Sequence, residues 1–402
     1  MKYIVLIGDG MGDYPIKELN NETVLQNART PNMDSIAKYG ITGFAKTVPD
    51  EMHPGSDVAN MSIIGYDTRK YYNGRAPLEA ASMGISLDKN DVAFRCNLVT
   101  VNDDTLKDYS AGHISTNEAR VVIEEINQQL GSKDIQFYPG MSYKHLMVAK
   151  NNIGANANCT PPHDIMNKDK HHYMPSGKDS ELLCDLIDRS YNILKNHRIN
   201  INRVNNKNLP ANSIWLWGQG YAPKIPHFKK LYGLSGSIIS AVDLIKGIGT
   251  YAGLDVIDVP GATGYLDTNY SGKANYAIDS LKNHDIVIVH VEAPDEAGHM
   301  GSISAKTQAI EDFDSLVVGK ILEYVQNNES NEDYTILVTP DHPTPISLKT
   351  HTSDPVPFAI YSTTINQPDE VDSFNEISME NGSLNTVDAS NFINMLLQIN
   401  QQ

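Results

Sequence analysis

Ile4-Val5-Leu6-Ile7-Gly8-Asp9 is an apolar run that ends at an aspartate, close to the start of the chain. Two later runs end in the same way: Ile286 to Val291 leads to Asp295, and Thr335 to Val338 leads to Asp341. Short β-rich runs of this kind are typical of buried parallel strands. In an open α/β sheet the ligand site lies beyond the carboxyl ends of the strands. We therefore expect the three aspartates to meet in one cleft, although they are far apart in the chain.

Three histidines accompany these aspartates: His299 follows Asp295 by one helical turn, His342 adjoins Asp341, and His351 comes shortly after. Each pair alone is a weak signal, because a histidine at a strand end more often makes a structural hydrogen bond. Together, however, three carboxylates and three imidazoles suffice for two divalent ions, with Mn²⁺ or Zn²⁺ favoured over Mg²⁺ by the imidazoles. Such a pair of ions clamps the attacking and leaving oxygens of a phosphoryl transfer.

A nucleophile for such a site is Ser56, in Pro-Gly-Ser56-Asp-Val-Ala-Asn. The Pro-Gly pair predicts a turn, and apolar residues recur at helical spacing from Val58 to Ile64, so that Ser56 begins a helix. A helix N-terminus and a metal ion both favour the alkoxide that attacks. The alternative is a plain N-cap serine, although Ala59 leaves no capping box. These residues alone leave both interpretations open.

The amino-acid composition changes between about residues 88 and 210, where Asn, Lys and Asp become more frequent. Helical periodicity within this segment covers 118–130 and 180–194. Because the chain of 402 residues is long enough for two domains, we expect an α/β domain formed by 1–87 and 211–402. The segment 88–210 would then be an inserted α+β domain.

The net charge of −17 disfavours nucleic acid and anionic membranes as partners. No apolar run approaches the roughly 20 residues that span a bilayer, and a strand directly after Met1 indicates no signal peptide. Cys96, Cys159 and Cys184 are few and unclustered, which is typical of a reducing compartment. We therefore expect a cytoplasmic protein.

Six motifs in a fixed order carry a resemblance to a known family: Gly-Asp9-Gly-Met-Gly-Asp, Pro-Gly-Ser56-Asp-Val-Ala-Asn, Gly74-Arg75-Ala-Pro-Leu-Glu-Ala, Pro294-Asp295-Glu-Ala-Gly-His299, Thr339-Pro-Asp341-His342 and His351-Thr-Ser-Asp-Pro-Val-Pro. Any one motif is modest, but the ordered set spans nearly the whole chain. It resembles the cofactor-independent phosphoglycerate mutases of the archaeal type, within the alkaline phosphatase superfamily. The resemblance implies an alkaline-phosphatase-like three-layer sheet domain with an inserted α+β cap domain.

The resemblance also implies an isomerase that interconverts 2- and 3-phosphoglycerate through a phosphoserine, without 2,3-bisphosphoglycerate. Two divalent ions would assist, Mn²⁺ or Zn²⁺ first and Mg²⁺ or Co²⁺ as alternatives. The implied ligands form two sets: Asp295, His299 and His351 for one ion, and Asp9, Asp341, His342 and the Ser56 hydroxyl for the other. A closed cap would keep water from the phosphoserine, and a homo-oligomer is compatible with the resemblance.

A substrate with a carboxylate and a phosphate favours arginine forks as binding groups. The candidates are Arg75, just after the nucleophile helix, and Arg95, in a strand-like run early in the insert. His163 and Lys224 are weaker candidates. For either arginine, a surface ion pair is the alternative interpretation.

One departure from the long bacterial form of the family concerns a strand segment, 213–220. That form carries paired arginines on the corresponding segment, whereas this chain has Trp215 and Trp217 there. Packing is the simpler interpretation of both tryptophans. The residues that supply this part of the substrate-binding charge are therefore a question for the structure.

Three other functions compete with a mutase. A phosphatase, phosphodiesterase or phosphopentomutase of the same superfamily would share the metal ligands, whereas a sulfatase is disfavoured because no Cys/Ser-x-Pro-x-Arg segment surrounds Ser56. A nicotinamide-dependent oxidoreductase is disfavoured because Asp13 occupies the last glycine position of G-x-G-x-x-G and Asp9 would repel a pyrophosphate. A non-catalytic metal-binding protein would be expected to lack a ligand, and none is missing.

Overall fold

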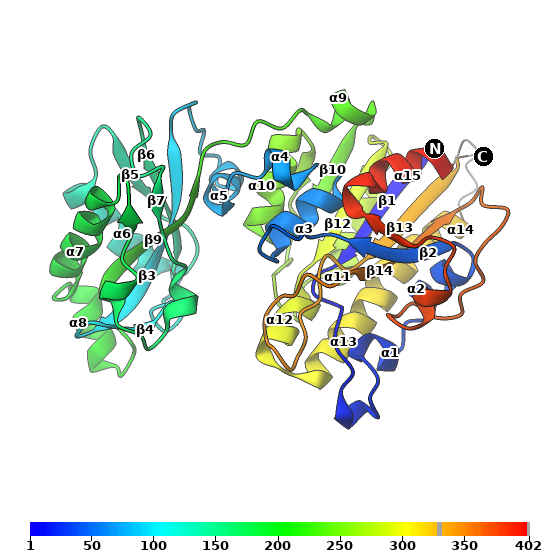
Figure 1. Ribbon diagram of the computed structural model, residues 1–402, viewed down its shortest axis with the longest axis horizontal. Coiled ribbons are helices and arrows are strands. Elements are labelled where there is room, and N and C mark those ends of the chain that lie inside the picture. The colour runs from blue at the N-terminus through cyan, green and yellow to red at the C-terminus, as the bar shows by residue number, and fades with distance from the viewer. Residues whose placement is uncertain (328–331, 400–402) are drawn as a thin grey trace. The chain divides into compact units, whose positions relative to one another are not determined.

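The computed structural model describes residues 1–327 and 332–399 (Figure 1). Residues 328–331 and 400–402, which belong to the expected segment 211–402, lie outside the described residues. The chain divides into two compact units: Met1–Tyr72 with Ile225–Gln402, and Asn73–Lys224. We call them the first and the second unit. The sequence predicts domain boundaries at 87 and 211. The exact start and end of an independently folding insert stay predictions.

The first unit is built on a sheet in which the described residues form eight strands, in the order β11-β10-β12-β1-β13-β14-β2-β15. Its five strands from β11 to β13 are mutually parallel, and β14 runs against its neighbours β13 and β2. The strand bounds are β1 (Lys2–Gly8), β2 (Ile41–Lys46), β10 (Gly236–Ile239), β11 (Asp255–Ile257), β12 (Ile286–Val291), β13 (Tyr334–Thr339), β14 (Val356–Ser362) and β15 (Thr386–Asp388).

Helices cover both faces of this sheet, which explains why β1, β12 and β13 are mostly apolar and are buried along almost their whole length. One face packs mainly against α1 (Val24–Asn27), α2 (Pro31–Lys38), α11 (Tyr270–Ser280), α13 (Ile303–Phe313) and α14 (Gly319–Gln326), with the π-helical turn η4 (Asp314–Val318) between the last two. On the other side lie α3 (Ser56–Ile63), α10 (Asp243–Ala252) and α15 (Phe392–Ile399) (Figure 1). The remaining helices are α4 (Thr68–Tyr71), α9 (Phe228–Tyr232) and α12 (Ala293–Met300), with the short turns η1 (Lys17–Leu19), η5 (Ser378–Asn381) and η6 (Ala389–Asn391).

The second unit, cyan to green in Figure 1, contains an antiparallel sheet in the order β4-β3-β6-β5, with β9 also paired to β3. Its main core lies between this sheet and the helices α6 and α7, and α5 packs against β3 with a smaller apolar cluster. The strands are β3 (Val92–Asn102), β4 (Thr105–Asp108), β5 (Ile135–Tyr138), β6 (Lys144–Ala149), β7 (Ala157–Asn158), β8 (Ser176–Gly177) and β9 (Ser213–Gly220). The helices are α5 (Arg75–Ser82), α6 (Thr116–Leu130), α7 (Glu181–Leu194) and α8 (Arg198–Asn205), with the turns η2 (Pro162–Ile165) and η3 (Lys170–His172).

The predicted fold class, a three-layer α/β sheet domain interrupted by an α+β unit, is confirmed. Among the residues described, none of the helices combines the length and the apolar character that crossing a bilayer requires.

Candidate active site

The three predicted aspartates lie at the same edge of the first unit's sheet. Strand β1 lies between β12 and β13, with Gly8 beside Val291 and Ile7 beside Thr339. The chain therefore leaves all three strands at one level, and the aspartates follow within a few residues. Asp9 and Asp341 are fully buried, and Asp295, in the first turn of α12, is nearly so. Parallel pairing thus brings together side chains that are far apart in sequence.

One group of candidate ligands consists of Asp9, Asp341 and His342. The His342 Nε2 lies 3.5 Å from Asp9 Oδ1 and 3.5 Å from Asp341 Oδ2. The Asp341 carboxylate is fixed from both sides, because the Gly10 amide donates to its Oδ1 at 3.0 Å and the Asn60 side-chain amide donates to its Oδ2 at 2.8 Å. Burial lowers the pKa of His342 to about 4, so its imidazole is neutral, as a metal ligand must be.

A second group surrounds Asp295. The His299 Nε2 lies 3.1 Å from Asp295 Oδ2, and the His351 Nε2 lies 3.4 Å from Asp295 Oδ1. The two imidazole Nε2 atoms approach each other to 3.0 Å. Because the His299 Nδ1 lies 3.0 Å from the Lys349 carbonyl oxygen, a neutral ring with its proton on Nδ1 would keep the Nε2 lone pair free for a cation shared with Asp295.

The electrostatics of both groups fit divalent cations. Burial, followed by the charge of Asp341, raises the pKa of Asp9 well above its usual value. None of the described residues donates a hydrogen bond to the buried Asp9 Oδ1, although a buried carboxylate oxygen is costly unless a proton or a cation faces it. At His299, burial opposes protonation, but the hydrogen bond to Asp295, the charge of Asp295 and the hydrogen bond to the Lys349 carbonyl together outweigh it and raise the pKa to about 9. Carboxylates and imidazoles in this proportion form a donor set that suits Mn²⁺ or Zn²⁺.

The two groups share an edge at His342. Candidate ligand atoms of Asp295, His342 and His351 lie within 4.8 Å of one another, and so do those of Asp9, Asp341 and His342. All six predicted ligands therefore belong to one continuous cluster, in which His299 reaches Asp295 and His351.

Ser56 is the first residue of α3, and Gly55 is the N-cap residue. Ser56 therefore does not itself occupy the N-cap position. Its Oγ instead lies 3.2 Å from the His342 Nε2, at a side chain that is almost entirely buried. One turn later, the Asn60 side-chain amide donates one hydrogen bond to the Ser56 carbonyl oxygen and another to Asp341 Oδ2, and so links α3 to Asp341. The hydroxyl therefore faces the candidate metal ligands.

Three further residues next to this cluster were not predicted from the sequence: His290 and Lys273, which are buried, and Glu292, which is half-buried. The His290 Nε2 lies 2.9 Å from Asp9 Oδ2, and burial lowers the pKa of His290 to about 3. The Glu292 Oε2 lies 3.9 Å from the same nitrogen. Behind them, the Lys273 ammonium donates to the His290 carbonyl oxygen at 2.9 Å. The only signal for His290 was a polar residue inside an otherwise apolar strand.

A buried ion pair fixes the loops that carry the ligands. The Lys306 ammonium, on α13, donates to Asp13 Oδ2 at 2.8 Å and to the carbonyl oxygens of Gly12 and Thr344, each at 2.9 Å. The Thr344 hydroxyl in turn donates to Asp295 Oδ1. One lysine therefore ties the loop after β1 to the loop after β13, which explains the aspartate at position 13.

The four candidate substrate-binding residues belong to the second unit. The Arg95 Nε lies 3.0 Å from Glu79 Oε2. The His163 ring meets the Trp217 ring edge-on at 5.3 Å. Two residues remain to be placed: Arg75 is the half-buried first residue of α5, and Lys224 is exposed at the end of the unit.

Comparison with known proteins decides the family. The family model of 2,3-bisphosphoglycerate-independent phosphoglycerate mutase matches residues 37–200. A curated relative with that name from Methanosarcina acetivorans is 61% identical over 99% of this chain and 100% of its own length. The chain belongs to the 2,3-bisphosphoglycerate-independent phosphoglycerate mutase family. The resemblance found in the sequence is therefore confirmed, and so is the prediction of an enzyme of the isomerase class.

Other relatives and solved structures agree with membership of this phosphoglycerate mutase family. A probable enzyme of the same name from Geobacter sulfurreducens is 50% identical over 99% of this chain and 100% of its own. A Pyrococcus horikoshii protein of known structure is 30% identical, with a TM-score of 0.85 and coverage of 100% of this chain and 98% of its own. The cofactor-independent phosphoglycerate mutase from Thermoplasma acidophilum is 28% identical, with a TM-score of 0.66 and coverage of 99% and 100%.

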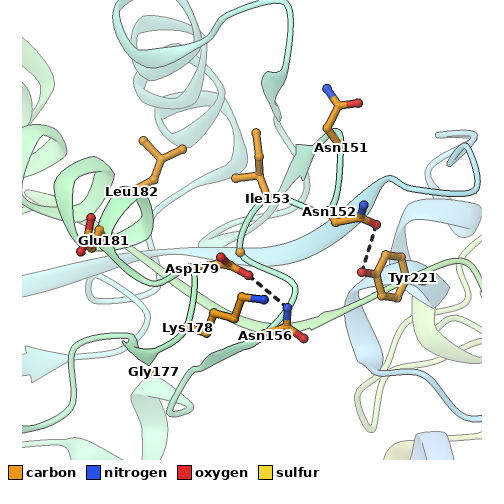
Figure 2. Close-up of a pocket in the computed structure, with 11 residues that line it drawn as sticks. Asn151, Asn152, Ile153, Asn156, Gly177, Lys178, Asp179, Glu181, Leu182 and Tyr221 are labelled. Atoms are coloured by element: carbon orange, nitrogen blue, oxygen red, sulfur yellow. Dashed lines mark hydrogen bonds between the residues drawn. The ribbon is translucent and has the colours of Figure 1, made fainter.

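A separate pocket of about 860 Å³ lies in the second unit of this family member (Figure 2). Its walls come largely from the loops 151–156 and 177–182. Figure 2 shows the two hydrogen bonds that cross it, from the Asn156 amide to Asp179 at 3.0 Å and from the Tyr221 hydroxyl to Asn152 at 3.2 Å. Among the described residues that line it there is no predicted ligand, nucleophile or substrate-binding group. The pocket is therefore separate from the candidate site.

Proposed function

We propose that the protein interconverts 2- and 3-phosphoglycerate through a phosphoserine at Ser56, with two divalent metal ions and without 2,3-bisphosphoglycerate. The observation that carries this proposal is the position of the Ser56 hydroxyl. It lies at the first residue of a helix, 3.2 Å from the His342 Nε2 and beside the cluster of candidate ligands. Family membership supports the substrate, because the relatives are named for this reaction.

The proposed ligands are divided into the two sets that the family resemblance implies, and the contacts within each set support this division. One ion is assigned to Asp295, His299 and His351, and the other to Asp9, Asp341, His342 and the Ser56 hydroxyl. The fit rests on the unpartnered Asp9 Oδ1 and on the mixed oxygen and nitrogen donors. The imidazoles favour Mn²⁺ or Zn²⁺ over Mg²⁺, and Co²⁺ is a further candidate. When bound, such ions neutralise charge on a phosphoryl group and lower the pKa of a coordinated hydroxyl.

The proposed chemistry takes place on Ser56 in two steps. In the first, the Ser56 Oγ bonds to phosphorus and loses its proton, while the bond from phosphorus to one glycerate oxygen breaks and that oxygen gains a proton. In the second, the other glycerate hydroxyl loses its proton and bonds to phosphorus, while the bond from phosphorus to the Ser56 Oγ breaks and Oγ gains a proton. The sum is a migration of phosphate with no net proton change. The N-terminus of α3 favours the serine anion in both steps.

The second unit is proposed to supply substrate binding and to exclude water. Between the two steps, water that reached the phosphoserine would release inorganic phosphate, and the enzyme would act as a phosphatase. Arg75, Arg95, His163 and Lys224 belong to the second unit, as binding groups on a cap would. A cytoplasmic location and a homo-oligomer stay predictions from the sequence.

The test is an enolase-coupled assay with 3-phosphoglycerate, run without 2,3-bisphosphoglycerate, on the metal-loaded enzyme. Ser56→Ala should retain the fold but exchange no phosphate. Ser62→Ala removes another buried hydroxyl of α3, which donates to the Val58 carbonyl oxygen, and should stay active as a matched control. Mass spectrometry of acid-quenched wild-type enzyme should find phosphate on the peptide that contains Ser56. An active Ser56→Ala enzyme would refute the mechanism, and release of inorganic phosphate without isomer exchange would indicate a phosphatase.

A further inference from the structure

Arg95 sits in a structured cluster within the second unit. It pairs with Trp217 across the antiparallel strands β3 and β9, and its guanidinium carbon lies 4.3 Å from the centre of the indole ring. From α5, the Glu79 Oε2 approaches its Nε to 3.0 Å. The side chains of Arg95 and Glu79 are only 9% and 15% exposed. One face and one edge of the guanidinium are thus held by neighbours from two different elements.

The indole ring that supports Arg95 is itself fixed. The Trp217 Nε1 donates to Asn97 Oδ1 at 3.0 Å, and the Asn97 amide donates to the Tyr109 carbonyl oxygen at 3.2 Å. The His163 ring packs edge-on against the indole with an interplanar angle of 73°. Because the hydrogen bond to Asn97 and the packing of the His163 ring both fix the indole, it presents a constant face to the guanidinium.

A bulge next to Trp217 brings a second arginine to the same place. The register of β3 and β9 shifts between Ala93 and Arg95, and Gly218, with φ of +61°, follows the tryptophan. A Cβ atom on Gly218 would lie 3.4 Å from Arg95 Cδ and 3.9 Å from Arg75 Cβ. Two candidate anion-binding arginines therefore flank one glycine, at a bulge of the kind that redirects side chains near functional sites.

We propose that Trp217 is a positioning residue for substrate binding: its indole face holds the guanidinium of Arg95, together with Glu79, in the orientation that binds an anionic group of the phosphoglycerate. This inference rests on the proposed function, which supplies the anion. It assigns Trp217 a role beyond the expectation from the sequence that both tryptophans pack. Trp215 fits that expectation, since its fully buried ring donates to the Thr160 carbonyl oxygen and no cation is described over its face.

The test compares two substitutions at Trp217 in the full-length, metal-loaded enzyme. Trp217→Leu removes both the ring face and the hydrogen bond to Asn97, whereas Trp217→Phe keeps an aromatic face and loses only the hydrogen bond. Because a desolvated cation–π contact corresponds to about five- to thirtyfold in binding, Trp217→Leu should raise KM for 3-phosphoglycerate by about that factor and change kcat much less. Trp217→Phe should restore most of the difference.

The matched control is Trp215→Leu, which removes a buried indole from the same strand. It should lower the melting temperature without raising KM, and circular dichroism should show that all three variants are folded. Arg95→Lys should raise KM in the wild-type enzyme but add little in the Trp217→Leu background, because the two residues act through one contact. An unchanged KM in Trp217→Leu, equal KM values for Trp217→Leu and Trp217→Phe, or full additivity with Arg95→Lys would overturn the inference.

Failure of the proposed function would look different. In that case the wild-type enzyme would show no isomer exchange, and calorimetric titration of 3-phosphoglycerate into wild-type enzyme and Trp217→Leu would replace the kinetic readout. Tighter binding by the wild-type enzyme would preserve the positioning role without the mutase reaction. Equal affinity, or binding to neither protein, would overturn the positioning role as well.

Discussion

The candidate functional groups of the two units differ in how their charges are balanced. The first unit gathers like charges, whereas the second pairs opposite ones. In the first unit the carboxylates of Asp9, Asp341 and Asp295 crowd together, and both burial and Asp341 raise the pKa of Asp9. In the second unit Arg95 is matched by Glu79 and rests on Trp217. Buried like charges need cations, whereas a matched pair is satisfied by its own partners. The first site is therefore expected to depend on metal, and the second to be organised by side chains alone.

Metal removal should separate the two sites most strongly. Exhaustive chelation should abolish isomer exchange, and His351→Ala should do the same while removing one of the two proposed ions, because an imidazole is lost from the group around Asp295. The coupled assay and metal analysis by mass spectrometry would measure both effects. His163→Ala in the second unit is the control and should leave the metal content unchanged. Full activity after chelation would show that the site in the first unit does not depend on metal.

Arginine substitutions probe the second site without touching the metal ligands. Arg75→Lys and Arg95→Lys should each cost roughly 1.5–3 kcal/mol of substrate binding if the guanidinium binds as a fork. Steady-state kinetics would show this as a higher KM with unchanged metal content. Arg189→Lys is a suitable control, because Arg189 forms an exposed pair with Asp185 on α7. Wild-type kinetics in both variants would return the two arginines to ordinary surface or structural roles.

His290 tests whether the first site is also positioned by protein contacts. Its Nε2 lies 2.9 Å from Asp9 Oδ2, so removing this contact should release the carboxylate and weaken metal binding by about ten- to hundredfold. His290→Leu would be compared with His290→Gln, whose amide can still donate to Asp9, by metal titration calorimetry. Equal metal affinities in the wild type and His290→Leu would show that Asp9 needs no such support.

The smallest expected effect is a pH dependence confined to the second unit. Burial lowers the pKa of His145 to about 3, and its Nδ1 accepts a hydrogen bond from the Gly140 amide. Since the unfolded chain binds this proton near pH 6.5, stability is full above that pH and is lost as pH falls towards 3. The loss at pH 5 is about 2 kcal/mol.

Urea unfolding followed by tryptophan fluorescence would measure this loss, because both tryptophans of the chain lie in the second unit. His145→Gln cannot gain the proton and should flatten the difference between pH 7 and pH 5. Exposed His171, paired with Asp104, provides the matched substitution His171→Gln, which should leave the difference intact. An equal difference in the free energy of unfolding between pH 7 and pH 5 in the wild type and His145→Gln would show that His145 does not cause the loss.

Much of the first unit could be predicted because its ligands follow strands. Asp9, Asp295 and Asp341 come within a few residues after apolar runs, and parallel strands end at one edge of a sheet. His290 and Lys273 could not be predicted in the same way. His290 lies inside the apolar run of β12, and Lys273 lies on a helix where a lysine is normally exposed. Only the packing of α11 on the sheet brings the ammonium to the His290 carbonyl oxygen.

The α/β class, the family and the set of six candidate ligands with Ser56 could all be predicted from the amino-acid sequence, because short motifs at strand ends carry this information locally. Tertiary structure alone decided how these residues are partnered. The contact of Ser56 with His342, the contact of His290 with Asp9 and the stacking of Arg95 on Trp217 join different segments. Strand register and a bulge set these distances, and neither can be read from the spacing of residues along the chain.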